Sequence, residues 1–173
     1  MKKTLIGIIL IFAVGFGAFL LYQVTKEEPS WKTYVNEELK FSIQYHSDML
    51  LPRSPCDSFI LASSEEEKNR IKNLRDAGIE IGYEIQGLEL GFCIIKPGGR
   101  TLTLVDIKEY QPSGVHTNIT FAGRDAIQVK QDNFVEIFVP HPSGEMMRIW
   151  YRYGSSFYEE IAVKMLSTFN FLE

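Results

Sequence analysis

Apolar and polar residues alternate with a period of two along most of this chain, which is the pattern of strands that bury one face. The first two such segments cover residues 31–35 and 41–45, and a short polar loop joins them. Similar segments, rich in β-branched and aromatic residues, predict further strands at 79–86, 88–95, 101–110, 118–121, 124–131, 134–139 and 146–153. Gly87 and Gly91 interrupt the pattern and predict bulges.

Two segments instead carry helical signals. Ser64, followed three residues later by Glu67, has the spacing of a capping box and predicts a helix over 65–77, with Gly78 as its stop. The apolar side of this helix holds only three residues (Ile71, Leu74 and Ala77). We therefore expect a mostly solvated helix in an insertion, and we read its acidic first turn as a solvated helix start.

The last segment changes its period from two to 3.6 and predicts an amphipathic helix over 155–168. Ile161, Met165 and Phe169 fall on one stripe, and Ser155 or Ser156 is a suitable cap. A strand-rich middle closed by such a helix predicts an α+β fold, in which helices cover a mostly antiparallel sheet.

The amino terminus has the pattern of a membrane anchor. Lys2 and Lys3 precede an uncharged, apolar run from Thr4 to Val24. A helix of that length spans roughly 31 Å, close to the hydrocarbon thickness of a bilayer. The two lysines predict a cytoplasmic amino end and an exported body. We therefore expect an anchor at 1–25, a polar linker at 26–30 and an exported domain at 31–173.

A cleaved signal peptide is the alternative interpretation of the same residues. Gly15 and Gly17 have the spacing of a cleavage site, but the chain stays apolar over 18–21, which disfavours cleavage there. The domain is exported in both cases and would be secreted after cleavage.

Composition supports a real core and argues against a nucleic-acid partner. The chain has 173 residues, of which 45% are hydrophobic and 13% aromatic. Removing the first 24 residues, which hold two lysines and no acidic residue, takes the formal net charge from −4 to −6. A domain this acidic has no general attraction for nucleic acid.

Three segments resemble the PsbP-like family, whose fold is shared with Mog1. The first is the strand pair over 31–45, which looks like the "tyrosine, turn, phenylalanine-x-isoleucine-x-tyrosine" start of the family. Residues 119–129 are similar to its central "glycine-arginine" hairpin, and residues 165–171 to its closing helix and short strand. The resemblance implies an α/β/α sandwich around an antiparallel sheet, of the membrane-anchored prokaryotic type.

The same resemblance implies an accessory protein, by analogy with family members that assist photosystem II. Two departures from the family pattern stand out: Tyr45 is followed by His46 where the family has proline, and residues 56–77 look like an insertion. The shared motifs are core-packing motifs, so no binding residue is carried over from the family.

Cys56 and Cys93 are the only two cysteines. An exported domain permits a disulfide, and we expect these residues to form one. The alternative is one buried thiol within the strand at 88–95 and one free thiol in a loop.

No catalytic or cofactor-binding motif is present in the sequence. The three histidines (His46, His116 and His141) lack the short spacings of metal sites, no serine lies in Gly-x-Ser-x-Gly, and no phosphate-binding glycine pattern occurs. We read Asp132 and Glu136 as ordinary solvated carboxylates. The sequence therefore predicts no catalytic residue, no metal and no cofactor.

Arg148, Trp150 and Arg152 alternate along one predicted strand and would share one face of it. They form a candidate interaction patch, although an ordinary amphipathic strand with snorkelling arginines gives the same pattern. We expect a non-catalytic, membrane-tethered interaction or assembly module with an unidentified protein partner. A small-ligand-binding domain and an exported hydrolase with a spatially assembled site are the alternatives.

Overall fold

Antiparallel strand pairing builds most of the structure, a computed structural model that describes residues 30–54, 56–79, 85–95 and 102–172. Residues 31–173 form one unit. Its elements in chain order are β1 (Trp31–Asn36), β2 (Phe41–His46), β3 (Ser58–Leu61), α2 (Glu65–Asp76), β4 (Leu88–Ile95), α3 (Ile107–Tyr110), β5 (Val115–Phe121), β6 (Arg124–Gln131), β7 (Phe134–Pro140), β8 (Met146–Tyr153), α4 (Ser156–Leu166) and β9 (Asn170–Phe171).

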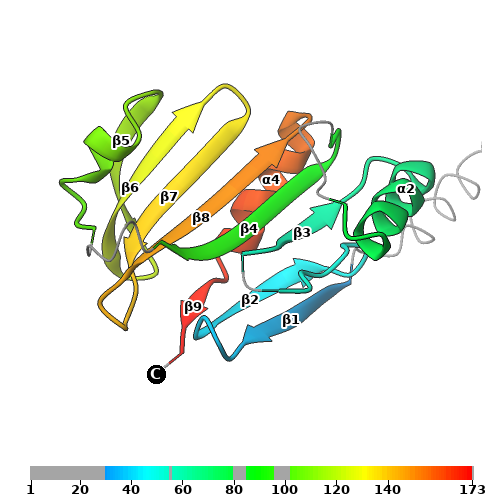
Figure 1. The fold of residues 1–173 in the computed structure, drawn as a ribbon, viewed down its shortest axis with the longest axis horizontal. Helices are drawn as coiled ribbons and strands as arrows, with labels where there is room; N and C mark the ends of the chain where they lie inside the picture. Colours follow the sequence, from blue (N-terminus) through cyan, green and yellow to red (C-terminus); the bar gives the residue numbers. More distant parts are fainter. Residues whose placement is uncertain (1–29, 55, 80–84, 96–101, 173) are drawn as a thin grey trace, which may run out of the picture. The chain divides into compact units, whose positions relative to one another are not determined.

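The strands form two sheets (Figure 1). A six-stranded sheet has the order β3-β4-β8-β7-β6-β5, and a three-stranded sheet has the order β1-β2-β9. Every strand pair is antiparallel. The predicted α+β class with a mostly antiparallel sheet is therefore confirmed.

One face of the six-stranded sheet, here called the inner face, carries the main core. Helix α4 and the three-stranded sheet both pack against it, and Ala162 and Met165 of α4 are fully buried. Phe41 and Phe92 lie at the centre, with their rings 4.5 Å apart, and Phe169 stacks on both. Burying each such ring stabilises the fold by about 1.5–3 kcal/mol. The layer that covers the inner face thus contains the three-stranded sheet as well as helix α4. The expected α/β/α sandwich has only helices in such a layer.

Among the described residues, those that cover the opposite, outer face lie towards its two ends. At one end, Ile71 of α2 packs on Ile60 of β3. At the other end, Ile107 of α3 packs with Phe138 of β7 and Met146 of β8. Between these two contacts, the outer face of β8 carries Arg148, Trp150 and Arg152.

Helix α2 confirms the predicted capping serine but corrects our interpretation of its first turn. The Ser64 hydroxyl accepts a hydrogen bond from the backbone N–H of Glu67 at 3.1 Å. Glu67 itself is buried, and its carboxylate accepts hydrogen bonds from both the N–H and the hydroxyl of Ser63 and from the N–H of Gln86. The segment taken for a solvated insertion is therefore tied to the sheet through Ile71 and to the segment before β4 through Glu67.

The strand predicted over 101–110 is wrong within its described part. Both the backbone N–H and the hydroxyl of Thr103 donate to the Asp106 carboxylate, at 2.8 and 2.7 Å, and the chain turns there. Helix α3 begins at Ile107, and Leu102 and Ile107 are buried in the same cluster. The apolar residues thus meet the core through a turn, although their spacing imitates a strand.

Two other predictions fall partly or wholly outside the described residues. Of the strand predicted over 79–86, residues 80–84 are not described, and Ile79, Ile85 and Gln86 lie outside any strand. The predicted anchor from Thr4 to Val24 is also outside the described residues. Within the part of the chain that is described, no helix is long and apolar enough to cross a membrane.

We predict that Glu67→Gln lowers the free energy of unfolding by about 1–3 kcal/mol near neutral pH, because buried donors lose a charged acceptor. Burial alone would raise the pKa of Glu67, but the hydrogen bonds from Ser63 and Gln86, with help from Arg70, hold this pKa below its ordinary value. A lowered carboxyl pKa stabilises the fold only where the group is ionised. The difference from wild type should be full above about pH 5 and fade as the pH falls from there.

Denaturant unfolding at several pH values measures this effect. Glu66→Gln is the matched control, since Glu66 lies exposed in the same helical turn. Equal losses in the two variants, or a difference that grows on acidification, would contradict the assigned role of Glu67.

Candidate interaction surface

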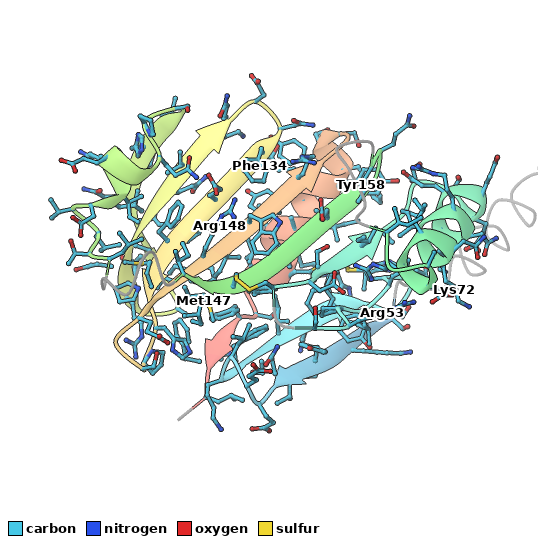
Figure 2. The ribbon with its side chains drawn as sticks, in the orientation of Figure 1. Arg53, Lys72, Phe134, Met147, Arg148 and Tyr158 are labelled. Carbon is cyan, nitrogen blue, oxygen red and sulfur yellow. A yellow bond between two sulfur atoms is a disulfide. The ribbon has the colours of Figure 1, made fainter. Side chains whose placement is uncertain are left out.

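Strand β8 divides its side chains between the two faces of the six-stranded sheet. Ile149 and Tyr151 are buried in the core of the inner face. Arg148, Trp150 and Arg152 therefore lie together on the outer face, as the alternation predicts, and all three are partly exposed. Figure 2 shows Arg148 in the middle of this face. We call these three residues, with Phe134 and Glu136 of the neighbouring strand, the β8 strip.

The indole of Trp150 lies across the neighbouring strand because that strand has glycine opposite it. Gly91 of β4 pairs directly with Trp150, and a Cβ atom at position 91 would come within 2.1 Å of the ring carbon Cζ2. The expected bulge at Gly91 is wrong, since its register with both β3 and β8 is regular. The glycine instead leaves the space that the ring occupies.

A buried carboxylate fixes the first arginine of the strip. Glu136 of β7 has only 5% of its side chain exposed, and Oε1 lies 2.6 Å from both Nε and Nη2 of Arg148. The Gln111 amide donates a weaker hydrogen bond to the same oxygen, at 3.4 Å. The guanidinium of Arg148 in turn lies 5.2 Å from the centre of the Trp150 ring. Our interpretation of Glu136 as a solvated carboxylate is therefore wrong.

The second arginine lies at the other end of the strip. The guanidinium of Arg152 stands 5.3 Å from the centre of the Phe134 ring, and Glu89 of β4 is its register partner. The hydroxyl of Ser58 donates to the Glu89 carboxylate at 2.9 Å. Both arginines thus lie over aromatic rings, an arrangement that suits the planar guanidinium group and helps to order it.

The strip has the chemistry of a binding surface. Tryptophan and arginine are among the residue types most enriched at the energetic centres of protein interfaces. Trp150 offers a broad apolar face, and it lies between Arg148 and Arg152 along the strand. Because β-sheet backbone supports all of these side chains, the surface is formed before a partner arrives.

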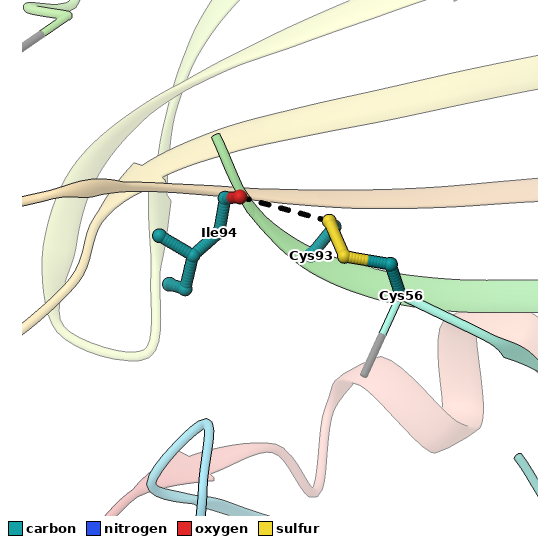
Figure 3. Close-up of a disulfide and its surroundings, with 3 residues drawn as sticks. All are labelled: Cys56, Cys93 and Ile94. Carbon is teal, nitrogen blue, oxygen red and sulfur yellow. Dashed lines mark hydrogen bonds between the residues drawn. A yellow bond between two sulfur atoms is a disulfide. The ribbon is translucent and has the colours of Figure 1, made fainter. Parts of the chain in front are cut away.

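The disulfide joins the loop before β3 to the outer face of β4 beside this strip (Figure 3). Cys56 and Cys93 are bonded, with Cα atoms 4.4 Å apart and a separation of 37 positions in sequence. The expected bridge is therefore confirmed. Cys93 is the register partner of Arg148, so the bridge and the strip share one surface.

The three histidines lie apart, and each has its own local partners. His46 packs edge-on to Trp31, with Nδ1 3.7 Å from Asp48. His116 bonds the carbonyl of Gln111, whereas the buried His141 bonds the carbonyl of Leu39. Across the described ranges, no group of three or more histidine, cysteine, aspartate or glutamate residues is arranged to hold a metal ion.

The fold defines an α+β domain of two antiparallel sheets. The chain matches no protein-family model and no curated protein. Among solved structures it is similar to cyanobacterial PsbP (CyanoP) from Synechocystis, at 10% sequence identity and a TM-score of 0.44, over 85% of this chain and 95% of that one.

We predict that Gly91→Ala displaces the Trp150 ring and destabilises the fold by about 1–3 kcal/mol, because the added methyl group overlaps the indole. Tryptophan fluorescence should report a more exposed indole. In a Trp150→Leu background the same glycine substitution should lower the free energy of unfolding much less. Equal costs in the two backgrounds would show that Gly91 serves another purpose.

We also predict that replacing both cysteines by alanine lowers the free energy of unfolding by about 3–4 kcal/mol, from the loop entropy of the unfolded chain. Denaturant unfolding of oxidised wild type and the double variant measures the difference. Reduced wild type should match the variant. Two free thiols in non-reducing mass analysis of the native protein would contradict the bridge.

Proposed function

We propose that this chain is a membrane-tethered binding module that acts outside the cytoplasm in a non-catalytic interaction or assembly role. In this proposal the β8 strip is the surface that binds a protein partner. One observation carries it: Trp150 is seated on Gly91 between two arginines, and the buried Glu136 fixes one of them.

Two features support the location outside the cytoplasm. The sequence pattern from Thr4 to Val24 is that of a membrane anchor with a cytoplasmic amino end. The disulfide between Cys56 and Cys93 is of the kind that persists in oxidising compartments. The two features are independent of each other and favour the same side of the membrane.

A protein partner fits the strip better than a polyanion does. The arginine charges are balanced close by, since Arg148 pairs with Glu136 and Arg152 lies opposite Glu89. A partner would therefore meet an apolar aromatic face flanked by two guanidinium groups whose charges are already balanced. We expect the complementary surface to present carbonyl or carboxylate groups around an apolar centre.

Capture of partners by the full-length chain in its native membrane tests the proposal. Cells would express tagged wild type or the Trp150→Leu/Arg152→Ala variant, and bound proteins would be quantified after mild cross-linking. The amount of specifically captured protein should fall at least about tenfold in the strip variant, as expected for hot-spot residues. Arg148 is left intact in this test, because removing it would strand Glu136 as a buried, unpaired charge.

Lys72→Ala is the control, since Lys72 is exposed on α2, away from the strip (Figure 2). It should capture partners as wild type does. Protease added to intact cells should digest the domain from outside. Equal capture by all variants would refute the role of the strip, and a protected domain would refute the location. Turnover of a test substrate with no captured protein would favour an exported hydrolase.

A further inference from the structure

Strand β5 forms one edge of the six-stranded sheet, and it lacks the usual protection of an edge. No other strand of the described ranges pairs with its open side. Its seven residues, Val115–Phe121, include no lysine, no other charged residue and no proline, and its pairing with β6 runs without a bulge. Natural sheets normally block open edges with charged residues, proline or bulges, because unpaired backbone groups can bind another strand.

The opposite edge of the same sheet differs from β5 in both length and cover. Strand β3 has four residues, all of them buried, and α2 packs against it. Of the seven β5 residues, four are exposed and only Phe121 is buried. The contrast identifies β5 as the edge that is open to strand addition.

Apolar surface accompanies this edge. Val115 at the start of β5 is 70% exposed, and Val105 in the preceding turn is 84% exposed. A depression of about 530 Å³ lies between that turn and β5, and Leu104, Val105, Asn118 and Ile127 are among its lining residues. Asn118 is the central residue of β5, so the exposed Val105 and the partly buried Leu104 lie beside the midpoint of the edge.

We propose that β5 is a self-association edge at which two copies of this chain pair antiparallel about a two-fold axis through Asn118. In that register Asn118 faces its own copy. Thr117 faces Ile119, His116 faces Thr120, and Val115 faces Phe121 of the second copy. The two six-stranded sheets then form one continuous sheet across the axis.

Self-complementarity favours a second copy as the occupant. Because β5 itself carries no charged residue, its own side chains bring no like charges together across the axis, which is the usual obstacle to pairing a strand with itself. The central asparagine amides can donate to and accept from each other. The axis also brings the two Val105 turns together, since each turn lies beside its own Asn118.

Single introduced cysteines test the register in the full-length chain in detergent micelles, because both native cysteines are already bonded to each other. Asn118→Cys should form a disulfide-linked dimer under mild oxidation. Thr120→Cys is the matched control on the same face of β5. Its two copies would lie about 13 Å apart, roughly four residues out of register, and should link at least about tenfold less. Equal linking at both positions would overturn the proposed register.

Charge substitution tests the association itself. Wild type should have the mass of a dimer by light scattering. Asn118→Lys and Asn118→Asp should each raise the dissociation constant of the dimer at least about 100-fold, because like charges then face each other. Mixing the two variants should restore the dimer. Asn118 is exposed, so unfolding of the variants should match wild type. A monomeric wild type, a dimeric Asn118→Lys, or failure of the mixture to associate would each overturn the proposal.

Discussion

The alternation along β8 is the constraint on which the rest of the structure depends. Its odd-numbered residues, among them Ile149 and Tyr151, must enter the core, and its even-numbered residues from Arg148 to Arg152 must leave it. A slip of one residue would put two arginines among phenylalanine rings and expose the aliphatic core. Pairing on both sides, with β4 and β7, fixes this register, and that fixed register places every residue of the β8 strip.

Glu136 makes the same register more specific. A carboxylate with 5% exposure is costly to bury unless a charged partner reaches it, and Arg148 supplies that partner at 2.6 Å. The pair therefore contributes little net stability but penalises any arrangement in which the two residues separate. The buried carboxylate of Glu136 therefore holds the guanidinium of Arg148 in one orientation beside Trp150.

Sequence patterns predicted the parts of this fold whose side chains face one way in a regular period. Strands β1, β2, β4, β6, β7 and β8 and helices α2 and α4 follow from the period of their apolar residues, and α2 also from its capping serine. Ser155 is the N-cap residue of α4, but its side chain makes no capping hydrogen bond. The three patch residues on β8 follow from the same alternation. The segment at 101–110 does not, because a turn closed by Thr103 and Asp106 spaces its apolar residues as a strand would.

The other features that the sequence did not predict share a different cause, which is contact between residues distant in sequence. Strand β3 is short and buried on both faces, so it has no alternation to detect. Gly91 resembles a bulge until Trp150, far along the chain, is known to lie over it. Glu136 gave one usable signal, since it interrupts an otherwise apolar strand, but that signal did not identify Arg148 as its partner.

The β8 strip and the β5 edge lie on one sheet, and sheet geometry relates them. Strands β7 and β6 separate β8 from β5, so pairing at β5 would place two β8 strips about seven strand steps apart, or about 34 Å. Adjacent strands rotate by roughly 20° per step, which turns the two strips through about 140° relative to each other. The strips of a dimer would therefore face away from one another. Such a dimer gains no avidity for a single flat partner and is instead suited to joining two separate partner molecules, each bound to one strip.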